Sequence, residues 1–80
     1  MIEQLETGKK VVGIKQVRRA VLAGLAQKVF LADDADPALT ENLQQLCDEN
    51  GVQTESVRSM AVLGKRCEIA VGAACAAILR

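Results

Sequence analysis

The stretch 11-VVGIKQVRRAVLAGLAQKVFLADDADP-37 decides the fold, because strand and helix patterns alternate within it. Its two leading valines predict a short strand, and Gly13 ends that strand. Apolar residues then recur at helical spacing, and Gly24 marks the end of the helix; the apolar positions are Ile14, Val17, Val21 and Leu25. Residues 28–32 are apolar and rich in β-favouring side chains, so they predict a buried strand. This succession indicates an α/β protein.

The start of that helix carries an unusual charge. Lys15, Arg18 and Arg19 follow Gly13 closely, at the end of a helix where the free backbone N–H groups favour Asp or Glu. Lys15, Gln16 and Arg19 are spaced so that they share one exposed side. A strand, a glycine and a helix start also form a common anion-binding geometry. The cations therefore indicate either an anionic partner or a solvated helix face.

The rest of the chain continues the alternation. Residues 2–8 predict a first short helix, and residues 52–57 alternate like a strand. Asp36 followed by Pro37 predicts a capped helix start, and Gly51 ends that helix.

The C-terminal part predicts one more helix and one more strand. A short helix capped by Ser56 or Ser59 is expected to carry three side chains on one face, namely Met60, Leu63 and Cys67. Residues 63–72 predict a helix end and a loop, and the alanine-rich residues 73–79 a final strand. We therefore expect a single domain, residues 1–80, with a central sheet covered by helices on both faces.

The formal net charge is zero, but the charges are segregated along the chain. Residues 1–28 carry six cations and two carboxylates, a net +4. Residues 29–56 carry seven carboxylates and no cation, and residues 57–80 carry four cations and one carboxylate, a net +3. We expect the two positive segments to lie side by side and to make one face basic, and a local patch rather than the total charge sets anion binding. Lys65 and Arg66, beside Gly64 at an expected element boundary, form a second basic group and favour an anionic partner.

The composition disfavours enzymes and metal sites. There is no histidine, the commonest general base, and neither the G-x-G-x-x-G motif nor a phosphate loop occurs. Three widely spaced cysteines form neither a disulfide framework nor a zinc site and are expected to be buried hydrophobes; they are Cys47, Cys67 and Cys75. The cluster of Asp33, Asp34 and Asp36 could suggest a cation site, but helix capping and a solvated turn explain these aspartates more simply. We expect no catalytic residue, no metal and no cofactor.

Other features limit the location and the kind of partner. No apolar run approaches the roughly 20 residues that cross a bilayer, and the N-terminus lacks a signal-peptide pattern, so a cytoplasmic, soluble monomer without a membrane partner is expected. Phe30, the only aromatic residue, is predicted to lie in the strand core. Any nucleic acid must therefore be recognised by shape, phosphates and polar side chains rather than by aromatic stacking.

Three stretches, in this order along the chain, resemble a known protein family: "GIKQVRRAVLAGLAQKVFLADDADP", "LCDENGV" and "SVRSMAVLGKRCEIAVGAACAAI". Together they resemble the family of archaeal large-subunit ribosomal protein seven-Ae, the kink-turn RNA binders, and especially its small bacterial YbxF-type branch. The resemblance implies a three-layer α/β/α sandwich with a four-stranded mixed sheet. It also implies an RNA-binding protein that stabilises kink-turns, bent helices with sheared G·A pairs, in ribosomal RNA or a riboswitch.

The resemblance also implies a site. Lys15 and Gln16, where the family usually has Asn-Glu, would face guanine edges, and Arg19 the next base or phosphate. Asp36 and the apolar residues 69–71 would contact a nucleotide flipped out of the bend. The expected RNA-binding residues are Gly13, Ile14, Lys15, Gln16, Arg18, Arg19, Lys28, Asp36, Lys65, Arg66, Ile69, Ala70 and Val71. Three departures from the family pattern, Met60, Glu68 and Ala70, imply lower affinity than that of the strongest members.

An alternative interpretation stays open. The same fold can serve as a protein-interaction module without specific RNA affinity, because a fold does not determine its function. The acidic helix at residues 37–50 would then be the contact face.

Overall fold

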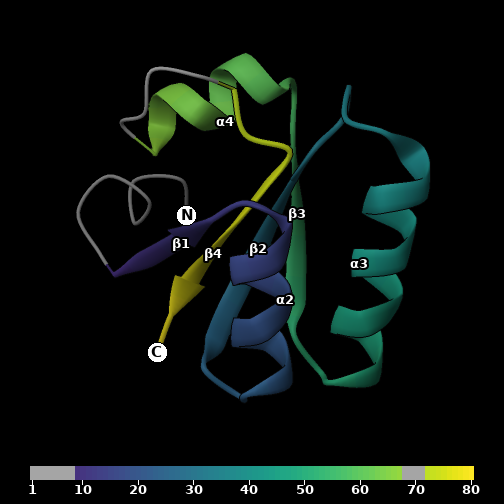
Figure 1. The fold of residues 1–80 in the computed structure, drawn as a ribbon, viewed down its shortest axis with the longest axis vertical. Coiled ribbons are helices and arrows are strands. Elements are labelled where there is room, and N and C mark those ends of the chain that lie inside the picture. Colours follow the sequence, from purple (N-terminus) through teal and green to yellow (C-terminus); the bar gives the residue numbers. More distant parts are fainter. Residues whose placement is uncertain (1–8, 68–71) are drawn as a thin grey trace.

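The computed structural model describes residues 9–67 and 72–80, which form a four-stranded sheet between two helical layers (Figure 1). The strand order is β1-β4-β2-β3, with β1 Lys10–Val12, β4 Cys75–Leu79, β2 Ala26–Ala32 and β3 Gln53–Val57. β2 and β3 are parallel, whereas β4 is antiparallel to both β1 and β2. The expected α/β sandwich with a four-stranded mixed sheet is confirmed.

The described helices divide between the two faces of the sheet. They are α2 Ile14–Leu22, α3 Pro37–Glu49 and α4 Met60–Arg66. Val17 of α2 and Leu43 of α3 belong to the core on one face, and Leu63 of α4 belongs to the core on the other. None of the described helices is long and apolar enough to cross a membrane. The helix predicted at residues 2–8 lies outside the described residues.

β4 lies inside the sheet, with both of its faces covered. Cys75 and Ala77 belong to the core beneath α2 and α3, while Ala76 and Ile78 belong to the core beneath α4. All four are at most 4% exposed. Small side chains let the helices approach both faces closely, so burial outweighs the helix propensity of alanine. The predicted final strand is confirmed.

α2 ends at the turn that Gly24 predicts, but the position of Leu25 and the start of β2 differ from the sequence prediction. The helix stops at Leu22, and Gly24 takes φ +74°, a left-handed conformation that favours glycine and reverses the chain. Leu25 therefore lies beyond the helix, with its side chain 55% exposed, and its carbonyl accepts from the N–H of Arg80 at 2.9 Å. Placing Leu25 on the apolar helix face was wrong, and β2 begins at Ala26 rather than at residue 28.

α4 is capped as predicted but buries a smaller face. The Ser59 hydroxyl accepts from the N–H of Val62 at 3.1 Å, which identifies Ser59 as the cap. Leu63 is buried as expected, whereas Met60, the first residue of the helix, is 37% exposed. Gly64 is buried inside the helix, which runs to Arg66. Its expected place at an element boundary was therefore wrong.

Candidate nucleic-acid interface

Four connections meet at one end of the sheet. In register, Val12 pairs with Ala76, Leu31 with Cys75, and Ala32 with Val57. The carboxyl ends of β1, β2 and β3 and the amino end of β4 therefore lie together. We call this end, with Gly13 and residues 33–36, 58–60 and 72–74, the loop end.

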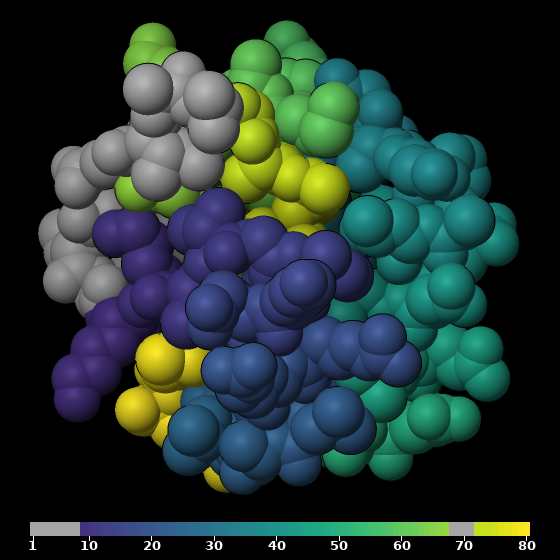
Figure 2. Space-filling model, in the orientation of Figure 1, coloured from purple at the N-terminus to yellow at the C-terminus, as the bar shows by residue number. Residues whose placement is uncertain are grey.

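Backbone hydrogen bonds tie these connections to one another. The N–H of Gly13 donates to the carbonyl of Cys75 at 3.1 Å, and the N–H of Asp33 donates to that of Val57 at 2.7 Å. The N–H of Ala32 donates to the carbonyl of Ala74 at 2.9 Å. In Figure 2 the chain around Gly13 (purple) lies against the start of β4 (yellow), with α4 (green) above. The turn before α2 is thus held by a backbone hydrogen bond to the start of β4 at the loop end.

Gly13 and Ile14 place the start of α2 at the loop end. Gly13 has φ +99°, a conformation that L side chains rarely adopt. Ile14 is half-buried and packs against the core beneath α2 and α3. In the described part of the chain no side chain caps α2, and its first turn contains no acidic residue. The free N–H groups at this helix start can therefore face a ligand.

Lys15, Gln16, Arg18 and Arg19 are all exposed on α2. Within residues 9–67 and 72–80 the only ion pair joins Lys28 to Glu55, so the α2 cations have no carboxylate partner there. α2 is so short that Arg19 already lies in its last turn, where a cation is favourable. The unfavourable interaction with the helix start thus concerns Lys15 above all.

Lys28 lies away from the loop end. It pairs in register with Gln53 at the start of β3 and with Ile78 near the end of β4. Its ammonium donates to Oε1 of Glu55 at 2.7 Å and lies 5.6 Å from the centre of the Phe30 ring. The structure therefore gives Lys28 a structural role, which it performs without RNA.

Lys65 and Arg66 are exposed in the last turn of α4, where the helix dipole favours cations. α4 packs on the opposite face of the sheet from α2. The two basic groups therefore do not lie side by side on one face, and that expectation was wrong.

The aspartates near α3 make structural contacts. Oδ1 of Asp36 accepts from the N–H of Ala38 at 3.0 Å as the cap of α3, and Oδ1 of Asp34 accepts from the N–H of Met60 at 2.7 Å. The second contact joins residues 26 apart, so no local pattern signals it. The described residues contain no group of three or more side chains that could hold a metal ion. Ile69, Ala70 and Val71 lie outside the described residues.

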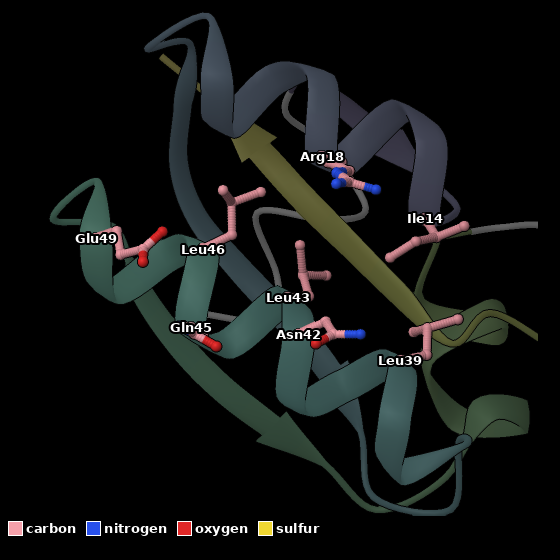
Figure 3. Close-up of a pocket in the computed structure, with 8 residues that line it drawn as sticks. All are labelled: Ile14, Arg18, Leu39, Asn42, Leu43, Gln45, Leu46 and Glu49. Carbon is pink, nitrogen blue, oxygen red and sulfur yellow. The ribbon is translucent and has the colours of Figure 1, made fainter.

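A groove of about 490 Å³ separates α2 from α3 (Figure 3). Its lining residues are Ile14, Arg18, Leu39, Asn42, Leu43, Gln45, Leu46 and Glu49. Arg18 stands on the α2 side, whereas α3 contributes amides and Glu49. α3 contains three acidic residues and no basic one, so its surface repels phosphate. On the side of α2 that faces α3, the surface suited to a polyanion therefore ends at Arg18.

The three cysteines are free and buried. Burial, together with a smaller contribution from the neighbouring Cys47, raises the pKa of Cys75 to about 11. Burial also raises the pKa of Cys47 and of Cys67. The thiols therefore stay protonated at neutral pH and act as small hydrophobic side chains, as the sequence predicted.

Comparison with known proteins gives consistent matches. Residues 2–80 match the profile of the Ribosomal protein L7Ae/L30e/S12e/Gadd45 family. The chain is 46% identical over 76 residues to an RNA-binding protein of Geobacillus sp. strain WCH70 and to the RNA-binding protein YbxF of Geobacillus stearothermophilus; each alignment covers 95% of this chain and 93% of the relative. The fold matches the Giardia lamblia 15.5kD RNA binding protein with a TM-score of 0.91 at 26% identity, covering 99% of this chain and 70% of that one.

Proposed function

Because the chain belongs to the Ribosomal protein L7Ae/L30e/S12e/Gadd45 family, we propose that it binds RNA and recognises and stabilises kink-turns. Curated relatives that align over nearly their whole length carry RNA-binding names. One observation on this chain carries the proposal: Lys15, Arg18 and Arg19 have no carboxylate partner among the described residues, on a helix whose start is uncapped. Its N–H groups and its cations attract the same phosphates.

The helix α2 offers two kinds of contact to RNA. Arg18, Arg19 and the free N–H groups suit phosphates, which set the register of the complex. Lys15 and Gln16 stand beside the Gly13 turn, and both side chains can donate to guanine O6 and N7. Phe30 is fully buried, so polar side chains rather than stacking would distinguish the sheared G·A pairs.

The remaining expected contacts extend this proposal. Asp36 and residues 69–71 would meet a nucleotide flipped out of the bend, and Lys65 and Arg66 would contact flanking phosphates. We expect a cytoplasmic monomer that acts on ribosomal RNA or on a riboswitch.

The experiment compares two duplexes in a gel shift: one with a kink-turn, and one whose G·A pairs are replaced by Watson–Crick pairs. The kink-turn should bind at least about tenfold more tightly, and both affinities should fall steeply with salt. Equal affinities would refute kink-turn recognition and leave general RNA binding. Absence of binding to both duplexes would refute RNA binding as well.

A protein-interaction module is the second candidate, and the surface of α3 favours it. Glu41, Asp48 and Glu49 make that helix acidic, and the groove of Figure 3 runs along it. Capture of a partner protein that survives ribonuclease, together with failure of the gel shift, would favour this function.

Met60→Lys should raise the affinity for both duplexes. Met60 lies at the loop end and is 37% exposed, so an ammonium group there can reach a phosphate. One added phosphate contact steepens the slope of log K against log salt by about 0.9. Titrations at several salt concentrations measure this slope, with the neutral Met60→Gln as control. An unchanged slope would mean that RNA does not pass over Met60.

A further inference from the structure

Three segments of the loop end meet at the main chain of Met60. Its N–H donates to Oδ1 of Asp34 in the β2–α3 connection at 2.7 Å. Its carbonyl accepts from the N–H of Ala73, just before β4, at 3.0 Å. A Cβ on Gly72 would lie 3.1 Å from Cβ of Met60 and 3.3 Å from its carbonyl carbon and oxygen, so glycine permits this close packing. A single residue thus joins the β2–α3 connection, α4 and the chain that enters β4.

Among these contacts, the one from Asp34 depends on a side chain. The bonds that Gly13, Ala32, Asp33 and Ala73 make across the loop end are all between backbone groups. The carboxylate of Asp34 also satisfies an N–H group at the start of α4 that lacks a partner within the helix, while Ser59 satisfies that of Val62. A carboxylate at a helix start makes a strong, charge-assisted bond. Substitution of Asp34 alone can therefore break the contact between the β2–α3 connection and Met60.

We propose that Asp34 is a positioning residue of the RNA interface, holding α4 and the Gly72–Ala73 segment in the arrangement that kink-turn RNA requires; this rests on the proposed function. Asp34 acts through Met60 rather than by touching RNA, because its negative charge repels phosphates. Fixing these segments before RNA binds lowers the conformational entropy that is lost when the complex forms. Residues 69–71, which are expected to contact the flipped nucleotide, immediately precede Gly72 in the sequence.

Asp34→Ala separates positioning from simple charge, since the two effects have opposite signs. Removal of a negative charge beside RNA strengthens binding, whereas loss of positioning weakens it. We expect the kink-turn affinity to fall about tenfold, as for the loss of one charge-assisted bond, with little change for the control duplex. Asp34→Asn keeps an oxygen that can accept from Met60 and should stay within about twofold of the wild type.

Asp33→Ala is the matched control. Asp33 is the adjacent exposed carboxylate, and its side chain makes no hydrogen bond to the described residues, so its removal changes charge alone. This variant should bind the kink-turn as tightly as the wild type or more tightly. If Asp34→Ala binds the kink-turn as tightly as Asp33→Ala does, the positioning role is refuted.

Amide exchange of Ala73 without RNA tests the same link independently of the proposed function. Exchange should accelerate in Asp34→Ala and stay unchanged in Asp33→Ala and Asp34→Asn. The reason is that Asp34 holds the main chain of Met60, whose carbonyl accepts from the N–H of Ala73. Gly72→Ala, which presses a Cβ against Met60, should also accelerate the exchange of Ala73. This variant replaces Asp34→Ala in the test if Asp34→Ala does not fold. Unchanged exchange in the folded variants refutes the inference. Equal binding of both duplexes by the wild type refutes only the proposed function.

Discussion

Phe30→Ala should lower the free energy of unfolding by about 3–5 kcal/mol. Phe30 is completely buried in the core between the sheet and α4, where it packs with Leu63 and Ile78. Several of its other neighbours are alanines, among them Ala32 and Ala76, whose short side chains cannot swing into the cavity. Domains of this kind have only about 5–15 kcal/mol of stability in total. A large share of the stability therefore depends on this one ring.

Urea denaturation followed by far-ultraviolet circular dichroism measures the loss. Leu25→Ala is the control: Leu25 is a large apolar residue that is 55% exposed, so its truncation should change stability by less than about 0.5 kcal/mol. A loss below about 1 kcal/mol for Phe30→Ala would contradict the packing beneath α4.

Elements bounded by local chemistry were predictable from the sequence. Gly24 and Gly51 both adopt positive φ where the helices before them end. Asp36 caps α3 with its own side chain, and Pro37 opens the helix. In each case the decisive interaction lies within a few residues, so it leaves a pattern in the sequence.

Details that depend on packing were not predictable in this way. Met60 has helical spacing with Leu63, yet it is partly exposed because it begins the helix at the end of the sheet. Gly64 suggested a boundary but lies buried inside α4. Spacing shows which residues share a helix face, whereas burial also depends on what lies opposite that face.

The same distinction holds for the candidate site. Exposure of Lys15, Gln16 and Arg19 followed from their spacing on one helix. The position of Lys28 depends on strand register, which pairs it with Gln53 and brings it to Glu55. Whether α2 and α4 share a face depends on topology, and so does the contact between Asp34 and Met60. Charge blocks in the sequence therefore indicated a polyanion without showing where the charges meet.

Lys15→Ala and Arg19→Ala should each weaken kink-turn binding by about 1–3 kcal/mol, the value of a good base contact. Neither side chain has an ion-pair partner in the described part of the chain, so binding should fall without loss of stability. For Lys15→Ala the unfolding free energy should rise by about 0.3–1 kcal/mol, because a cation leaves the positive start of α2. Arg19→Ala should show no such gain, since Arg19 lies in the last turn. Gel shifts measure the affinity and urea denaturation the stability.

Lys28→Ala is the matched control, because it removes the same charge from a site away from the loop end. It should change kink-turn affinity by less than about 0.5 kcal/mol while lowering stability, since Glu55 loses its partner. The two variants should therefore differ in both measurements: Lys28→Ala lowers stability and leaves kink-turn binding nearly unchanged, whereas Lys15→Ala weakens binding and slightly raises stability. If both weaken binding equally, affinity follows the total charge of the protein, and α2 holds no specific site.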